Sequence, residues 1–158
     1  MTKIPITTHG AEMLRAELHK LKTAERPSVI TAIAEARAQG DITENAEYEA
    51  ARERQSFIEG RIIELETKLA NAQVIDPKLL DDDDRVVFGS TVELVDTGSN
   101  QTVTYQIVGE DEADLKLAKI SYSSPIAKAL IGKSSGDVAE VRTPGGVKEF
   151  EIVDVRYI

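Results

Sequence analysis

Apolar residues three or four positions apart mark the core-facing side of a helix. In the first half of the chain they are Leu14, Leu18, Leu21, Ile30 and Ile33. Thr8 is placed to cap this helix at its start, and Gly40 to end it. Pro27 has no backbone N–H, so we expect it to bend the helix or to interrupt it for a turn.

A second helical pattern follows, with an almost regular heptad spacing. Its positions are Tyr48, Ala51, Gln55, Ile58, Ile62, Leu65 and Leu69. Two long helices joined by a few residues fold back antiparallel. We therefore expect residues 1–75 to form a coiled-coil hairpin, roughly 45 Å long at ~1.5 Å per residue, with residues 40–50 at its tip.

From Val86 onward the apolar positions alternate with polar ones, which is typical of strands. The five predicted strands are VVFGSTVELVD, TVTYQIVG, DLKLAKISY, DVAEVRT and VKEFEIVDVRYI. TPGG at 143–146 is a turn between the last two. One short helix interrupts the strands, with Ser124 as its N-cap, Pro125 at its first position and Gly132 at its end. The sequence therefore predicts a compact α+β domain at 86–158.

The segment DPKLLDDDDR at 76–85 separates the two patterns. Repulsion among its four consecutive aspartates favours an extended, exposed linker. We interpret it as a spacer, with metal binding as the lesser alternative.

Charge and composition exclude several classes of protein. The net charge is −9 and the pI about 4.8, which disfavours binding to duplex DNA by phosphate neutralisation. If nucleic acid is involved, another molecule holds it. No cysteine is present, and no apolar run approaches the ~20 residues that span a bilayer. We expect a cytoplasmic protein without membrane contact.

The predicted tip carries four carboxylates within nine residues: Asp41, Glu44, Glu47 and Glu49. Asp41 as N-cap with Glu44 three residues later fits a capping box, which explains one or two of these acids. Two exposed carboxylates also suit Mg²⁺, which prefers oxygen ligands. Because the chain offers no second acid cluster placed to complete such a site, the alternative to capping is half a metal site on a long arm.

Several long motifs resemble one family along essentially the whole chain. They are AEARAQGDITENAEYEAARERQ, NAQVID, VVFGSTVEL, YQIVGEDEAD, ISYSSPIAKALIGKSSGD and TPGG. In this order they resemble the Gre family of bacterial transcript cleavage factors. The resemblance implies an N-terminal antiparallel coiled coil, followed by a C-terminal FK506-binding-protein-like (FKBP-like) antiparallel sheet with one short helix.

The resemblance also implies a mechanism. In the family the globular domain docks on the rim of the secondary channel of RNA polymerase, and the coiled coil enters that channel. Two tip acids, here Asp41 and Glu44, help to hold the second catalytic Mg²⁺ and to position the attacking water. The polymerase then hydrolyses its own backtracked RNA near the 3′ end. On this reading the protein is an accessory factor rather than an enzyme, and it holds no Mg²⁺ in isolation.

The resemblance assigns further contacts. Arg37 and Arg52 match a basic patch that contacts the extruded RNA, although arginines beside acids on a hairpin are also ordinary solvated ion pairs. Thr43 stands where several relatives carry a basic residue, which favours short cleavage products. Ser123, Ser124 and Pro125 match a polymerase-contacting loop, a role compatible with capping of the short helix.

The resemblance and the residues together define the expectation. We expect a monomer that releases arrested elongation complexes. The main alternative is a Gre-like protein that binds the secondary channel and modulates or inhibits polymerase without promoting cleavage. A peptidyl-prolyl isomerase is disfavoured because the chain is 4% aromatic and has no tryptophan. A coiled-coil chaperone or adaptor would have no evident use for an acidic tip.

Overall fold

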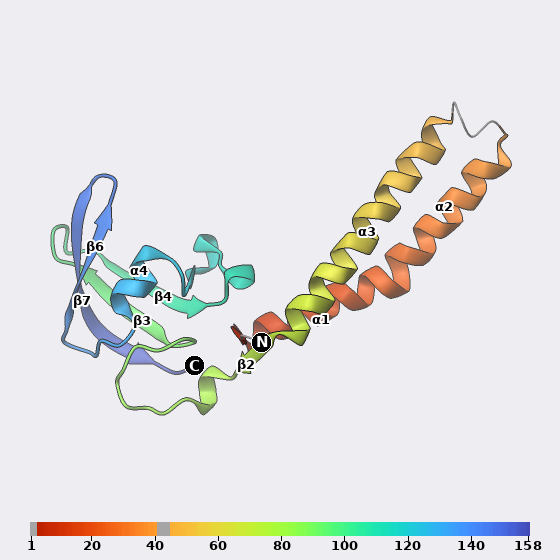
Figure 1. The fold of residues 1–158 in the computed structure, drawn as a ribbon. Helices are drawn as coiled ribbons and strands as arrows, with labels where there is room; N and C mark the ends of the chain where they lie inside the picture. Colours follow the sequence, from red (N-terminus) through yellow and green to blue (C-terminus); the bar gives the residue numbers. More distant parts are fainter. Residues whose placement is uncertain (1–2, 41–44) are drawn as a thin grey trace. The chain divides into compact units, whose positions relative to one another are not determined.

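The structure, a computed structural model, describes residues 3–40 and 45–158. Contacts within the chain group it into two compact units (Figure 1). The first unit is Ala11–Ala72, which we call the arm. The second unit, which we call the globular unit, consists of two stretches of the chain, Thr2–Gly10 and Gln73–Ile158. It is therefore discontinuous in sequence. The domain boundaries expected above, 1–75, 76–85 and 86–158, stay predictions about independent folding.

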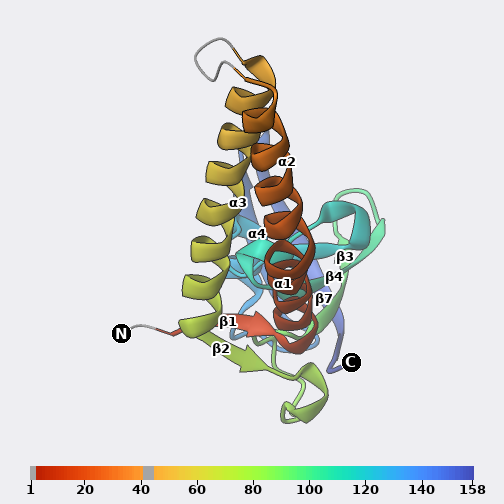
Figure 2. The same cartoon turned by 90° about the vertical axis from the view of Figure 1, so that its right-hand side faces the viewer.

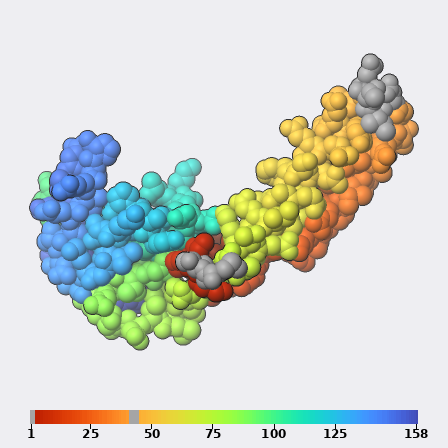
Figure 3. Space-filling view, in the orientation of Figure 1, coloured from red at the N-terminus to blue at the C-terminus, as the bar shows by residue number. Residues whose placement is uncertain are grey.

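The arm is a helical hairpin, as the apolar spacing predicts. The first half of the hairpin consists of three consecutive helical segments. They are α1 (Thr8–Lys20), the π-helix η1 (Leu21–Glu25) and α2 (Arg26–Ala38). It returns through α3 (Ala46–Ala70). Figures 1 and 2 show α2 and α3 side by side, and the space-filling view shows their side chains in contact along the arm (Figure 3). The buried side chains of α3 are Ala51, Ile58, Ile62 and Leu65, all four of which lie on the predicted seam.

The chain stays helical through Pro27, and a π-helical turn directly precedes this part of the helix. The Arg26 N–H donates to the carbonyl of Leu21, five residues back. Such a turn takes one residue more than an α-helical turn, so it shifts the phase of every later position by one. Val29 is buried and Ile30 is exposed. The prediction that Pro27 bends or interrupts the helix missed this shift, and the assignment of Ile30 to the core is wrong.

The globular unit contains a five-stranded sheet in the order β5-β4-β3-β7-β6. The strands are β3 (Thr91–Asp96), β4 (Thr102–Val108), β5 (Lys119–Ser121), β6 (Val138–Thr143) and β7 (Gly146–Arg156). All neighbours pair antiparallel except β4 and β5, which are parallel. The five predicted strands are confirmed, but the sheet is mixed rather than antiparallel. The parallel pair arises because the chain turns back through 3-10 turns at Glu110–Glu112 and Leu115–Leu117 before β5.

The short helix α4 (Pro125–Leu130) buries Ala127 and Leu130 in the same core as the sheet. Leu94, Ile107 and Ile152 lie at the centre of this core and are fully buried. At ~25 cal/mol per Å² of apolar area removed from water, such burial is the main stabilising term of the unit. Gly146, with φ at 122°, forms the predicted turn between β6 and β7.

The start of the chain is held in the globular unit by a buried carboxylate. β1 (Ile4–Thr7) pairs with β2 (Ala72–Ile75) in a two-stranded sheet. The side chain of Glu112 is 8% exposed, and it accepts hydrogen bonds from the Thr7 N–H, the Thr7 hydroxyl and the Gly109 N–H. The Thr7 hydroxyl oxygen in turn accepts from the N–H of Gly10, so Thr7 rather than Thr8 caps α1.

The acidic segment at 76–85 is exposed at its four aspartates, as expected, but it is not a free spacer. Pro77–Leu79 form a 3-10 turn with Asp76 as its N-cap. The Tyr157 hydroxyl donates to the carbonyl of Arg85 and to the Asp83 carboxylate. Burial, together with the Asp83 charge, raises the pKa of Tyr157. The segment is therefore fastened to the end of the chain.

Ion pairs across the arm predict a weak acid sensitivity. Arg61 donates to both carboxylate oxygens of Glu17, at 2.6 and 2.9 Å, and these bonds lower the Glu17 pKa below its ordinary value of 4.5. A lowered folded-state pKa stabilises the protein above the ordinary value, and the contribution is lost as the pH falls below it. Because Glu17 is 41% exposed, we expect this ion pair to contribute less than ~1 kcal/mol to the free energy of unfolding. Thermal unfolding at pH 7 and pH 3 should show a smaller acid-induced loss of stability for Glu17→Gln than for the wild type.

Candidate functional site

The predicted metal-holding residues, Asp41 and Glu44, lie outside the described residues, as does Thr43. The structure does describe both helix ends that lead to this segment. α2 ends at Ala38, where Gln39 is the C-cap, and Gly40 adopts a positive φ of 114°. That conformation favours glycine, so Gly40 ends the helix as its sequence position predicts.

Asn45 is the N-cap of α3 and also joins the two helices. Its side-chain oxygen accepts from the N–H of Tyr48 at 3.1 Å, and its side-chain amide donates to the carbonyl of Ala36 at 2.7 Å. The cap of α3 is therefore accounted for without Asp41 or Glu44. The capping-box interpretation, in which Asp41 caps the second helix, is wrong for α3.

Glu47 and Glu49 lie in the first turn of α3, where both are exposed. A negative charge there is favourable because the helix dipole places partial positive charge at this end, an effect of about 0.3–1 kcal/mol. This explains two of the four clustered acids by helix electrostatics. The described residues contain no group of three or more histidine, cysteine or acidic side chains that would hold a metal ion.

The two predicted RNA-contacting arginines lie on different helices near the tip. Arg37 is exposed in the last turn of α2. Arg52 is exposed on α3, donates to the Tyr48 hydroxyl at 3.1 Å, and lies with its guanidinium 5.9 Å from the centre of the Tyr48 ring. Tyr48 is half-buried, so it both packs in the hairpin and positions Arg52. The RNA-contact role of the two arginines stays a prediction.

The predicted polymerase-contacting residues form the turn between β5 and α4. Ser124 caps α4, since its hydroxyl accepts from the N–H of Ala127 at 3.3 Å. The Ser123 hydroxyl is hydrogen-bonded to that of Ser121 at 2.7 Å. Pro125 is exposed at the first helical position. The turn is thus hydrogen-bonded within itself and partly exposed, and its contact with polymerase stays a prediction.

Sequence reasoning missed Asn45. The signal was present, because Asn is among the best N-cap residues and it directly precedes the helix-favouring run AEYEAARERQ. Because Asp41 and Glu44 have the spacing of a capping box, the N-cap was predicted at Asp41, four residues before Asn45. The hydrogen bond from Asn45 to Ala36 has no local signal, since it joins residues on different helices.

Comparison with known proteins supports one family over the whole chain. The family model described as "Transcription elongation factor, N-terminal" matches residues 4–74, and the model "Transcription elongation factor, GreA/GreB, C-term" matches residues 81–157. The chain is similar to Transcription elongation factor GreA of Ralstonia nicotianae, with 65% identity over 100% of both chains. It is similarly related to that of Verminephrobacter eiseniae, with 66% identity over 99% of each.

Solved structures include two relatives. GreA factor homolog 1 of Thermus thermophilus is 31% identical, with 98% of this chain and 99% of that chain covered and a TM-score of 0.43. The GreA/GreB elongation factor of Nitrosomonas europaea is 28% identical, with 98% and 100% covered and a TM-score of 0.43. The family matches confirm the resemblance to the Gre family and, within it, to GreA. Along residues 3–40 and 45–158, no helix has the length and apolar character to cross a membrane.

Proposed function

Because this chain belongs to the GreA/GreB family of transcription elongation factors, we propose that it enters the secondary channel of RNA polymerase and stimulates hydrolysis of backtracked RNA there. The factor is then an accessory to a reaction that polymerase itself performs. Arrested elongation complexes resume synthesis from the new 3′ end. The site of action places the protein in the cytoplasm, where it acts as a monomer.

Asp41 and Glu44 are the residues that would share in holding a Mg²⁺ with the polymerase active site. Their carboxylates are oxygen donors of the kind Mg²⁺ prefers, and two such ligands leave positions for water and for the partner's groups. A bound Mg²⁺ of this kind activates water and stabilises the displaced oxygen. Asp41 and Glu44 add two negative charges to the segment of the sequence that joins α2 to α3.

The observation that supports these roles is the cap of α3. Asn45 satisfies the Tyr48 N–H, and Glu47 and Glu49 already complement the helix dipole. The N-cap of α3 is therefore Asn45, and this position does not need Asp41. Asn45 also joins α2 to α3 on either side of the acidic segment, so it acts as a positioning residue for the arm's end.

The globular unit would supply the docking surface. Ser123, Ser124 and Pro125 form its hydrogen-bonded turn before α4, and we assign them to contact the rim of the channel. Arg37 and Arg52 flank the acidic segment from opposite helices, and we assign them to the backtracked RNA. Arg52 also contacts Tyr48 through a hydrogen bond and a cation–π contact, which favour one orientation of its guanidinium.

The alternative, a channel-binding factor that modulates polymerase without promoting cleavage, is not favoured. The curated relatives at 60–66% identity are named Transcription elongation factor GreA.

A cleavage assay tests the proposal directly. An elongation complex of the cognate polymerase, arrested and carrying labelled RNA, is incubated with the full-length protein and Mg²⁺. We expect the RNA to be shortened from its 3′ end and then extended again when nucleotides are added. Polymerase binding without faster cleavage would instead establish the modulator alternative.

The isolated protein should have no nuclease activity. Two carboxylates provide only part of a catalytic metal site, and the polymerase is expected to supply the rest. Highly purified protein incubated with labelled RNA and Mg²⁺ should leave the RNA intact. Hydrolysis that persists after removal of contaminating nucleases, and that is lost in Asp41→Asn, would contradict the accessory role.

A further inference from the structure

The buried side chains of the hairpin's first half follow a regular spacing with one longer interval. From Leu14 to the end of α2 they are Leu14, Leu21, Val29 and Ala36. The longer interval is residues 22–28. Half-buried Leu18 and Ile33 supply apolar side chains within the two shorter intervals. The half-buried side chains of 22–28 are instead Glu25 and Arg26, which are both charged. The longer interval therefore adds no buried or half-buried apolar side chain to the packing between the helices.

The backbone hydrogen bonds of the helix are also irregular within this interval. The Arg26 N–H donates five residues back, to the carbonyl of Leu21, in the π-helical turn. Pro27 has no N–H, so it cannot donate to the carbonyl of Thr23, where an α-helix would form its next hydrogen bond. Sharp helix kinks occur mostly at prolines and π-bulges. Residues 22–28 therefore combine two separate reasons for a helix to bend.

The opposite helix is weakened at the same level of the hairpin. Arg26 donates to both carboxylate oxygens of Glu59, at 2.8 and 2.6 Å, so the neighbouring Gly60 lies at this level of α3. Glycine in a helix interior is about fivefold less favourable than alanine. A Cβ on Gly60 would meet no atom within 4 Å, so packing within the described arm does not require a glycine. In the described helices of the arm, Pro27 and Gly60 are the only proline and the only glycine.

Ion pairs join the two helices at this level. Arg26 pairs with Glu59 at 2.6 Å, and Arg54 pairs with Glu25 at 2.7 Å. All four side chains are between 33% and 46% exposed. Ion pairs of this kind are weak and are screened by salt. They join the helices here without the fixed geometry of a packed core.

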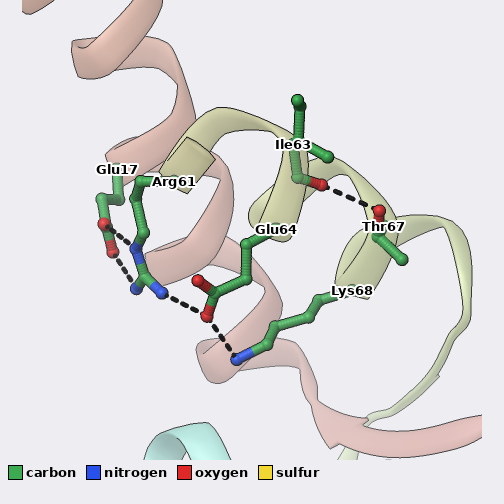
Figure 4. A network of polar contacts seen from close by, with 6 residues as sticks. All are labelled: Glu17, Arg61, Ile63, Glu64, Thr67 and Lys68. Atoms are coloured by element: carbon green, nitrogen blue, oxygen red, sulfur yellow. Dashed lines mark hydrogen bonds and ion pairs between the residues drawn. The ribbon is translucent and has the colours of Figure 1, made fainter. Parts of the chain in front are cut away.

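The arm is fastened differently on either side of this level. Towards its start, Arg61 joins Glu17 of α1 to Glu64 of α3 in a network of polar contacts (Figure 4). Towards its other end, the side-chain amide of Asn45 donates to the carbonyl of Ala36. Regions with few buried contacts open locally at a lower cost in free energy than the structure around them. Two fastened parts with such a region between them form the arrangement of a hinge.

We propose that the arm is hinged at residues 22–28 and Gly60, so that its outer part, which leads to the acidic segment, changes direction relative to its inner part. Hinges of this kind absorb the change in backbone conformation at a few residues. In the complex with polymerase, the hinge adjusts the position of the acidic segment while the globular unit stays docked. This use of the hinge rests on the proposed function, whereas the hinge itself is a property of the isolated arm.

Amide hydrogen exchange of the full-length protein tests the hinge without polymerase. We expect the amides of residues 22–28 to exchange about tenfold faster than those of 30–36, since local opening exposes them first. Gly60→Ala should slow the exchange of the amides around residue 60 about fivefold. Thr67→Ala is the matched control, because it replaces another weaker helix former by alanine at an exposed position two turns along α3. It should leave exchange at the hinge unchanged. Equal exchange in 22–28 and 30–36, or equal effects of the two variants around residue 60, would overturn the proposal.

The cleavage assay tests what the hinge does in the complex. Gly60→Ala should bind the cognate polymerase within about twofold of wild type, but its maximal rate of stimulated cleavage at saturating factor should fall about threefold. Its melting temperature should stay equal or rise, because alanine favours the helix and its Cβ meets no atom. Unfolding would therefore not explain the slower cleavage. Thr67→Ala should cleave as the wild type does. A wild-type cleavage rate in Gly60→Ala would overturn the role of the hinge in cleavage. Absence of stimulated cleavage with the wild type would instead overturn the proposed function, and hydrogen exchange would still decide whether the arm is hinged.

Discussion

Asp41→Asn and Glu44→Gln should each reduce stimulated RNA cleavage on the order of a hundredfold, while polymerase binding stays within about twofold of wild type. Each amide keeps the size of the acid and removes its negative charge. At ~1.4 kcal/mol per tenfold in rate, weakening one metal ligand by a few kcal/mol has this effect. The measurements are cleavage rate in an arrested complex, affinity for polymerase, and melting temperature, all on the same two variants.

Asn45→Ala provides the contrast to these variants. It removes the cap of α3 and the bond to Ala36, so it should lower the melting temperature, whereas the two amide variants should leave it nearly unchanged. Near-normal cleavage in both amide variants would exclude the metal-holding role. A clear loss of stability in Asp41→Asn would restore a structural role for that carboxylate.

Glu112→Ala should be the most destabilising single change considered for the globular unit. It would leave the buried N–H groups of Thr7 and Gly109 and the Thr7 hydroxyl without their shared acceptor. An orphaned buried donor costs about 1–3 kcal/mol, so we expect a loss of roughly 3 kcal/mol. This corresponds to a fall in melting temperature of about 10 °C for a protein of this size.

Glu110→Ala is the matched control, because Glu110 lies in the same 3-10 turn and is exposed. It should change the melting temperature little. Gly10→Ala should be destabilising as well, since its Cβ would overlap the buried carboxyl group of Glu112. Equal melting temperatures for Glu112→Ala and Glu110→Ala would show that the buried carboxylate does not hold the start of the chain.

Local sequence patterns predicted most of the architecture. The spacing of Ala51, Ile58, Ile62 and Leu65 identified the buried side of α3, and alternation identified the five strands. The position of Ile30 was predicted wrongly because the π-helix before it depends on one hydrogen bond, Arg26 to Leu21, that shifts the phase by one residue. Such a shift has no signature in apolar spacing alone.

Long-range features were the ones that sequence patterns did not predict. Thr7 and Glu112 are 105 residues apart, and each alone looks like an ordinary polar surface residue. The parallel pairing of β4 with β5 likewise depends on how the intervening turns return the chain. For the candidate site, the acid cluster was visible in the sequence. Its functional assignment required the family resemblance, because local rules also favoured a helix cap.

The discontinuous globular unit has a consequence for the order in which a newly synthesised chain acquires its structure. β1 is made first, but the Glu112 that holds Thr7 is made 105 residues later. The arm's contacts lie within residues 11–72, so they are available while the ribosome is still translating the rest. The sheet is completed only by β7, which pairs with both β3 and β6 and is the last of its five strands in chain order. A nascent chain interrupted before β7 therefore has the sequence of the arm but lacks the strand that joins β3 to β6 in the unit assigned to docking.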